Sequence, residues 1–374
     1  MKQTNNAPKQ QRLRSLDALR GFDMFWIIGG QRIILALAAL TGWPLFKWLH
    51  SQMNHVKWEG FAFYDLIFPL FLFLAGVSMP FSFGKRLSNG DSKASIYNHA
   101  FTRMITLIIL GMLYNRILNF DEEHLRFASV LGRIGIAWFL AAIIFLNTSL
   151  HWQIVWFWGL LISYYLLMQF VPVPGFGAGV LTLEGNLSGY IDRLLLPGTL
   201  HLKVMEPEGI LSTIPSIGTA MLGVFAGTFL HSQKVNFSKI QKGLIIIFAG
   251  LVSLAVGKLW GLFFPIIKNL WTSSFTLYAG GWSLLLLGIF YLIIDVWGFK
   301  KWAFFFVVIG LNPITIYIVQ YKIINFNTMR DFFFGGFMRI APESVVPLIG
   351  SIGYTAGVWM FLYILYRKKI FLKV

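Results

Sequence analysis

Long apolar runs separated by short polar segments extend along most of the chain. A helix needs roughly 20 mostly apolar residues to cross a hydrocarbon layer of about 30 Å. On that template the pattern predicts about ten membrane spans, near residues 18–40, 61–83, 99–118, 128–146, 153–171, 211–230, 242–262, 273–295, 303–323 and 346–366. The runs are continuously apolar and do not alternate with period two, which favours helices over a β-barrel. We therefore predict an all-α fold, a polytopic membrane helix bundle.

The basic residues between these runs predict the orientation of the bundle. An even number of spans places both termini on one side of the membrane. If that side is the cytoplasm, the cytoplasmic segments hold about twice as many Lys and Arg residues as the opposite segments, as the positive-inside rule requires. We therefore expect cytoplasmic termini in a multi-pass protein of the cell inner (cytoplasmic) membrane.

Two regions lie outside the pattern of spans. Residues 1–14 are polar and are expected to form a flexible cytoplasmic tail, which leaves residues 15–374 as one transmembrane domain. Residues 172–210 form a long extracytoplasmic segment that contains Gly and Pro for turns and a short apolar stretch, "YIDRLLL". A loop of this length is usually functional or contacts a partner.

The composition agrees with a membrane protein and narrows its chemistry. Only 12% of the 374 residues are charged and 57% are hydrophobic, whereas soluble domains carry about 25% charged residues. The net charge of +16 is spread over short loops and is not gathered in one stripe, so we expect membrane lipids and no nucleic acid as partners. Cysteine is absent, which excludes thiolate nucleophiles and Cys-ligated zinc. The sequence has neither HExxH nor a close pair of histidines, and we predict no metal site.

Ionisable and polar residues inside the spans mark candidate sites. Asp17, Arg20 and Asp23 recur every third residue, so they form either a structural ion-pair ladder or a polar wall toward a bound ligand. Arg133 lies one turn inside the fourth span, flanked by two glycines, where it either snorkels or forms a salt bridge, or binds phosphate in a bidentate manner. Asn312 precedes a proline, which breaks a helix and frees backbone carbonyls at membrane depth.

The segment "NHVKWEG" at 54–60 brings a histidine next to charged groups at the entrance to the second span. If this segment is helical, His55 and Glu59 lie one turn apart, and the carboxylate orients the imidazole. Asp65 follows at the start of the span and is a second candidate for that role. Because histidine is the side chain that exchanges a proton near neutral pH, His55 is the candidate catalytic residue.

Several longer motifs, in order along nearly the whole chain, resemble one known family. They include "RLRSLDALRG" at 12–21, "NHVKWEGFAFYDLIFPLFLFLAG" at 54–76, "VLGRIGIAWFLAA" at 130–142, "EPEGILSTIPSI" at 206–217, "KNLW" at 268–271 and "GLNPITIY" at 310–317. On these motifs the chain is similar to the heparan-alpha-glucosaminide N-acetyltransferase family of transmembrane acetyltransferases. The resemblance implies a prokaryotic member without the large luminal domain of the mammalian proteins.

The resemblance also implies an activity. In that family an acetyl group moves from cytosolic acetyl-CoA, a co-substrate, to the amine of a glucosamine-type sugar on the other side of the membrane. The active histidine of the family lies in the motif that here reads "NHVKWEG", which assigns the catalytic role to His55. It acts either as general base in a ternary complex or as carrier of the acetyl group, and Asp65 or Glu59 orients it. The family further implies a homodimer.

Charged and polar residues are the candidates for holding the two substrates. Those predicted to hold acetyl-CoA from the inner side are Arg14, Arg20, Arg133, Asn312, Lys368 and Lys369. Those predicted to hold the acceptor sugar are Asp23, Asp192, Arg193, Glu206 and Glu208, of which the last four equally fit ion pairs that brace the long loop. A transporter or flippase for a glycan or lipid-linked sugar, and an acyltransferase with a hydroxyl acceptor, remain alternative functions.

Overall fold

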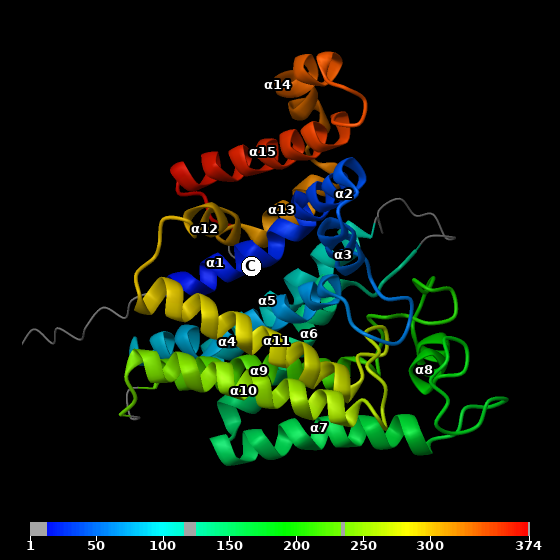
Figure 1. Cartoon of the computed structure of the whole chain (residues 1–374). Helices are drawn as coiled ribbons and strands as arrows, with labels where there is room; N and C mark the ends of the chain where they lie inside the picture. The colour runs from blue at the N-terminus through cyan, green and yellow to red at the C-terminus, as the bar shows by residue number, and fades with distance from the viewer. Residues whose placement is uncertain (1–12, 116–124, 233–235, 373–374) are drawn as a thin grey trace, which may run out of the picture.

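A computed structural model shows a bundle of α-helices over residues 13–115, 125–232 and 236–372, the part of the chain that it describes (Figure 1). Residues 1–12, most of the predicted N-terminal tail, lie outside that part. The helices are α1 (Arg14–Phe25), α2 (Gln31–Thr41), α3 (Pro44–Gln52), α4 (Ile67–Ser88), α5 (Lys93–Tyr114), α6 (Val130–Asn147), α7 (Leu150–Phe170), α8 (Leu187–Leu195), α9 (Thr213–His231), α10 (Lys239–Trp260), α11 (Ser273–Phe290), α12 (Phe304–Gly310), α13 (Pro313–Lys322), α14 (Phe326–Ile340) and α15 (Val346–Arg367). In the described residues β-structure amounts to isolated bridges, and the predicted all-α fold is confirmed.

Nine helical segments of the described chain are long and apolar enough to cross a membrane. They coincide with nine of the ten predicted spans, and in the first of them α1 continues through a π-helical turn, Trp26–Gly30, into α2. The remaining predicted span, 303–323, is divided between α12 and α13, which meet at Asn312 and Pro313. Proline lacks an N–H donor and collides with the preceding helical turn, so the break lies where the sequence places its proline.

Close packing of α4 on α9 forms the centre of the bundle. A side chain on Gly223 or Gly227 of α9 would collide with the α4 backbone at Phe73 and Val77. Small residues at such crossings let helix backbones approach each other in a membrane, where lipid removes the hydrophobic drive for association. Together with α11, these two helices are the most buried of the spans, and they give the connecting segments a rigid base.

The two ends of the bundle differ in what covers them (Figure 1). At one end α1 begins beside the end of the α11 span, because the backbone N–H groups of Arg14 and Ser15 each donate to the Asp295 carboxylate at 3.1 Å. At the other end, on the right of Figure 1, lie α3, α8 and the connections that precede α9 and α11. This second end holds the candidate site.

Candidate active site

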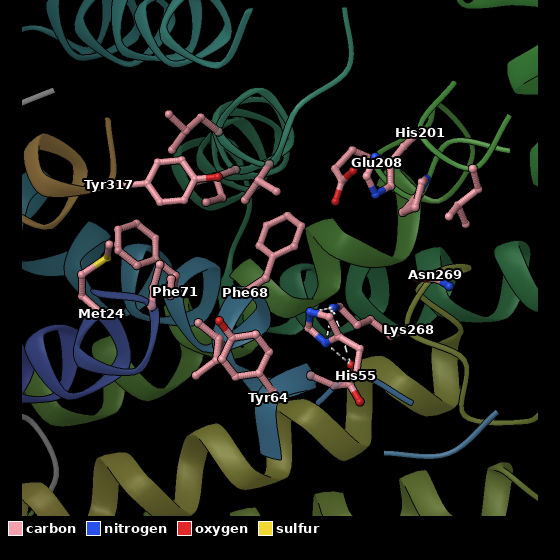
Figure 2. A pocket seen from close by; sticks show the side chains of 18 of the residues that line it. Met24, His55, Tyr64, Phe68, Phe71, His201, Glu208, Lys268, Asn269 and Tyr317 are labelled. Atoms are coloured by element: carbon pink, nitrogen blue, oxygen red, sulfur yellow. Dashed lines mark hydrogen bonds and ion pairs between the residues drawn. The ribbon is translucent and has the colours of Figure 1, made fainter. Parts of the chain in front are cut away.

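A cavity of about 510 Å³ opens at the loop-covered end of the bundle. Its inner part is lined by apolar residues of α1, α4, α6 and α13, and Met24, Phe71 and Tyr317 lie on the side away from His55 (Figure 2). Its mouth is lined by polar residues from four connecting segments. An apolar chamber with a few convergent polar groups is typical of a small-molecule site.

The segment that carries His55 is an extended turn and not a helix. Gly60 has a φ of +119°, which L-residues rarely adopt, and its N–H donates to the carbonyl of Ile266 at 2.9 Å. Glu59 is exposed and forms a β-bridge with Ile267. The prediction that a helix brings Glu59 one turn from His55 is therefore wrong, and Glu59 instead joins this segment to the connection before α11.

Asp65 fixes this turn and holds His55 through the same carboxylate. One of its oxygens accepts the N–H groups of Ala62 at 3.0 Å and Val56 at 3.4 Å, and the other lies 2.7 Å from Nδ1 of His55. The Asp65 side chain is fully buried, whereas that of His55 is 49% exposed and lines the cavity. A carboxylate at Nδ1 selects the tautomer that is protonated there and leaves Nε2 as the acceptor. The structure thus brings together two of the predicted catalytic residues.

A third polar group, Lys268, reaches His55 from the connection between α10 and α11 (Figure 2). Its Nζ lies 2.9 Å from Nδ1 and 3.2 Å from Nε2 of His55, and 3.5 Å from Oδ1 of Asp65. Burial lowers the pKa of the Lys268 ammonium below its ordinary value, while Asp65 and Glu208 act in the opposite direction. Lys268 was not predicted as a site residue, because it lies 213 positions from His55 in the sequence. The motif "KNLW" that it begins was the one available signal.

Acidic groups face the same cavity from the segment before α9. The Arg126 guanidinium joins two carboxylates, since its Nε donates to Glu206 at 2.9 Å and its Nη2 contacts Glu208. Burial is the largest single influence on the pKa of Glu206 and raises it, but the hydrogen bond and charge of Arg126, with hydrogen bonds to Glu208 and to the His201 N–H, together hold the pKa below its ordinary value. Burial raises the pKa of Glu208, which lines the cavity with His201 (Figure 2). Of these two predicted acceptor ligands, Glu208 reaches the cavity and Glu206 braces it.

Asp192 and Arg193 belong to the long loop and are not part of the described cavity lining. Asp192 is buried and accepts the N–H of Ile210 at 2.9 Å, and burial raises its pKa to about 6. Arg193 donates from Nη1 to the carbonyl of Val204 at 2.6 Å and from Nη2 to that of Glu184 at 3.3 Å. These contacts favour the loop-bracing alternative for both residues.

The basic residues predicted to hold acetyl-CoA do not form one group. Arg20 contacts the Ser78 hydroxyl of α4, in the half of the bundle away from His55. Arg14, Lys368 and Lys369 are exposed near the start of α1 and the end of α15. These four residues belong to α1 and the end of α15, and their contact with acetyl-CoA stays a prediction.

Arg133 lies elsewhere. Its guanidinium is buried and donates from Nη2 to the carbonyl of Gly209 at 3.1 Å and to the hydroxyl of Ser212. It also lies over the ring of Trp271, 5.3 Å from the centroid. The prediction that groups Arg133 with the inner basic residues is therefore wrong, and this residue supports the segment before α9 at the His55 end.

Asn312 holds the C-terminal segment of the chain. Its Nδ2 donates to the carbonyl of Ile370 at 3.0 Å, and its Oδ1 accepts the N–H of Leu372 at 3.0 Å. The predicted contact between Asn312 and the acetyl end of CoA does not fit this geometry, because both polar atoms of the amide are engaged. The next residue, Pro313, lines the cavity instead.

The predicted ladder on α1 is also incomplete. Arg20 pairs with Asp17 at 3.5 Å, whereas neither carboxylate oxygen of the fully buried Asp23 has a hydrogen-bond partner among the described residues. Asp23 is not part of the cavity lining either, although its neighbour Met24 is. The polar wall predicted for this helix is thus replaced by an apolar one.

The side chains at the cavity mouth are arranged for proton transfer or nucleophilic attack. Nε2 of His55 is directed by the Asp65 contact at Nδ1, and an ammonium lies beside the ring. Within the described residues, no group of three or more His, Asp or Glu side chains is placed to hold a metal ion.

Comparisons with known proteins agree with the motifs. A family described as "Heparan-alpha-glucosaminide N-acetyltransferase, catalytic" matches residues 12–260. The chain is 30% identical to heparan-alpha-glucosaminide N-acetyltransferase of Homo sapiens and 28% identical to that of Mus musculus. Each alignment covers 97% of this chain, which spans 60% of the length of either relative. The family match includes His55 and Asp65 and ends before Lys268.

Proposed function

The chain belongs to the heparan-alpha-glucosaminide N-acetyltransferase family, and on that premise we propose that it moves an acetyl group from acetyl-CoA across the membrane to the amine of a glucosamine-type sugar. Membership and the nine membrane-capable helices of the described chain support a multi-pass membrane acetyltransferase. The donor, the acceptor and the role of His55 are the parts proposed.

The contact between His55 and Asp65 at the cavity mouth carries the proposal. Acetyl transfer needs a group that removes a proton from the attacking amine, or one that takes the acetyl group itself. With Nδ1 held 2.7 Å from a buried carboxylate, Nε2 of His55 is oriented toward either task. A histidine that only supported the fold would not need to expose half of its side chain to a cavity.

Acetyl-CoA is proposed to enter from the opposite, cytoplasmic end. Met24 lines the inner part of the cavity, and Arg20 lies one helical turn, about 6 Å, farther along the same face of α1. Phe71 lines the cavity as well, and Ser78, which contacts Arg20, lies two turns farther along α4. A CoA molecule with its phosphates near Arg20 would extend its pantetheine arm along these two faces toward His55.

The acceptor is proposed to bind at the mouth, between His55 and the acidic segment before α9. A glucosamine amine is a cation when protonated, and the Glu208 carboxylate at the mouth attracts it. The ammonium loses one proton to water at the mouth, and the neutral amine then attacks the thioester carbonyl while Nε2 of His55 takes a second proton from the nitrogen. In the alternative route the imidazole attacks first and carries the acetyl group to the amine.

Transport across sealed vesicles tests the proposal. Purified protein is placed in liposomes with acetyl-labelled acetyl-CoA on one side and glucosamine on the other, and the acceptor side is analysed for N-acetylglucosamine by mass spectrometry. We expect product only when acetyl-CoA is on the side of the termini, and no product with the His55→Ala variant. Labelled protein recovered without acceptor would identify the acetyl-carrier route.

Two results would contradict the proposal. Unmodified glucosamine crossing the membrane without acetyl-CoA turnover would favour the transporter or flippase alternative. Full turnover by His55→Ala would remove the assigned chemistry. Replacing glucosamine by N-acetylglucosamine, which offers hydroxyls but no free amine, tests the hydroxyl-acceptor alternative in the same vesicles.

A further inference from the structure

Lys268 has a position at the cavity that support of the fold does not explain. Its Nζ contacts both His55 and Asp65, its side chain is 20% exposed, and it lines the cavity beside the His55 ring. Two backbone contacts join the connection that contains Lys268 to the turn that contains His55. They are the hydrogen bond from Gly60 to Ile266 and the β-bridge between Glu59 and Ile267. The connection thus places an ammonium group at the point where the acetyl group would react.

The distances show how the ammonium is oriented. The lone-pair directions of the two His55 ring nitrogens diverge in the plane of the ring. Nζ of Lys268 lies 2.9 Å from Nδ1 and 3.2 Å from Nε2, so it lies against the ring and cannot be in line with both nitrogens. An ammonium has three N–H donors and no acceptor. Nδ1 carries its own proton and Nζ lies against the ring, so Asp65 takes one of the three donors and the others remain for the cavity.

Acetyl transfer needs such a donor. Attack on the thioester places a negative charge on the carbonyl oxygen, and a fixed charged donor in a water-poor site is the usual means of stabilising it. The inner walls of this cavity are apolar, and the nearest other cation at its mouth, Arg126, already holds the carboxylates of Glu206 and Glu208. Lys268 is the cation of the described lining that lies beside His55.

We propose that Lys268 is a catalytic residue whose ammonium donates a hydrogen bond to the carbonyl oxygen of the acetyl thioester as this oxygen becomes an oxyanion. The inference rests on the function proposed above and adds to it the group that stabilises the intermediate. A bond forms between the amine nitrogen and the carbonyl carbon, the π electrons move to the oxygen, and the amine proton passes to Nε2 of His55. The oxyanion then re-forms the carbon–oxygen double bond, the carbon–sulfur bond breaks with its electron pair leaving on sulfur, and the CoA thiolate takes the proton from His55. Lys268 stays protonated throughout.

The charge of Lys268 predicts a pH dependence. The groups that face it are His55 and Asp65 from the turn before α4, and Glu208 and His201 from the segment before α9. Burial lowers the pKa of Lys268. The ammonium therefore loses its proton at a pH lower than the ordinary lysine pKa of about 10.4. The turnover rate is therefore expected to fall at the alkaline end of the pH profile as Lys268 deprotonates.

Substitution of Lys268 tests the proposal. We expect Lys268→Met to lower kcat by about 10²- to 10³-fold, the loss typical of one oxyanion donor, and to leave the KM for acetyl-CoA within about threefold. Lys268→Arg should recover at least tenfold over Lys268→Met and remove the alkaline fall, because arginine keeps its proton. Lys57→Met is the matched control, since Lys57 is exposed on the same turn as His55 and does not line the cavity.

The outcomes separate this inference from the proposed function. Inactive His55→Ala together with kcat within threefold of wild type for Lys268→Met would overturn the role of Lys268 and leave the acetyl transfer in place. A Lys268→Met variant that shifts only the acidic limb of the pH profile would also overturn it, because Lys268 would then act through His55. If Lys268→Met fails to fold, Lys268→Arg decides alone, and an unchanged alkaline fall in that variant would contradict the proposal.

Discussion

Two connecting segments at the same end of the bundle carry charged residues but direct them differently. In the turn before α4, His55 faces the cavity and the buried Asp65 orients it from behind. In the long loop, Oδ1 of Asp192 and the guanidinium of Arg193 bind backbone groups of the loop itself. A charged loop residue therefore indicates a functional site when its polar atoms face a cavity. It stabilises the loop when backbone groups bind those atoms.

This difference predicts two kinds of effect. Substitutions in the turn before α4 should change the rate of acetyl transfer more than the stability of the protein. Substitutions in the long loop should change stability more than rate.

His55→Ala is expected to lower kcat by about 10²- to 10⁴-fold, because it removes the group that handles the amine proton. Acetyl-CoA binding, measured by calorimetric titration, should be retained. His50→Ala is the control, since His50 is an exposed residue of α3 outside the described cavity lining. Equal losses in both variants would mean that this end of the bundle is sensitive to any change and would end the contrast.

Asp192 is expected to make the stability of the long loop depend on pH. Burial raises its pKa from 3.8 to about 6, so the fold favours the protonated form. Its stabilising contribution is complete below about pH 4 and is lost as the pH rises through about 6, a change of about 3 kcal/mol at 1.36 kcal/mol per unit of pKa. Thermal unfolding in detergent from pH 4 to 7 should show this fall in wild type and a flatter profile in Asp192→Asn.

A control separates Asp192 from the other carboxylates. Asp331→Asn alters an exposed group outside the long loop and should leave the pH profile of unfolding unchanged over the same range. An Asp192→Asn variant with the wild-type profile would show that another group causes the pH dependence.

Asp65→Asn is expected to lower kcat by about 10- to 100-fold, the kinetic equivalent of the roughly 1.5–3 kcal/mol that a hydrogen bond to a charged group contributes. The amide keeps one oxygen for the N–H groups of Ala62 and Val56 but removes the negative charge at Nδ1 of His55. Steady-state kinetics with both substrates measure the change. A normal kcat with a lowered unfolding temperature would place Asp65 with the loop-bracing residues.

Arg193→Ala is expected to have the smallest effect. The side chain is exposed and donates to two backbone carbonyls of its own loop, so its loss should change stability by no more than about 0.5–1 kcal/mol. The KM for the acceptor should stay at the wild-type value. A severalfold rise in that KM, with acetyl-CoA kinetics unchanged, would restore the prediction that Arg193 holds the sugar.

The sequence by itself determined the features that depend on neighbouring residues. The length and apolar character of nine spans follow from local composition, because within a membrane a single segment can satisfy its backbone hydrogen bonds only as a helix. The break at Pro313 follows from local sequence as well. His55 and Asp65 were also found, since they lie ten positions apart within one long motif.

The tertiary structure decided the features that depend on contacts between distant segments. Glu59 does not orient His55 as predicted, because its backbone pairs with Ile267. The same pairing places Lys268 beside His55. Arg133 donates hydrogen bonds to the segment before α9, and Asn312 donates one to the C-terminal segment. A buried polar atom binds the partner that packing brings within hydrogen-bond distance. Hydrophobic periodicity does not indicate which distant segment supplies that partner.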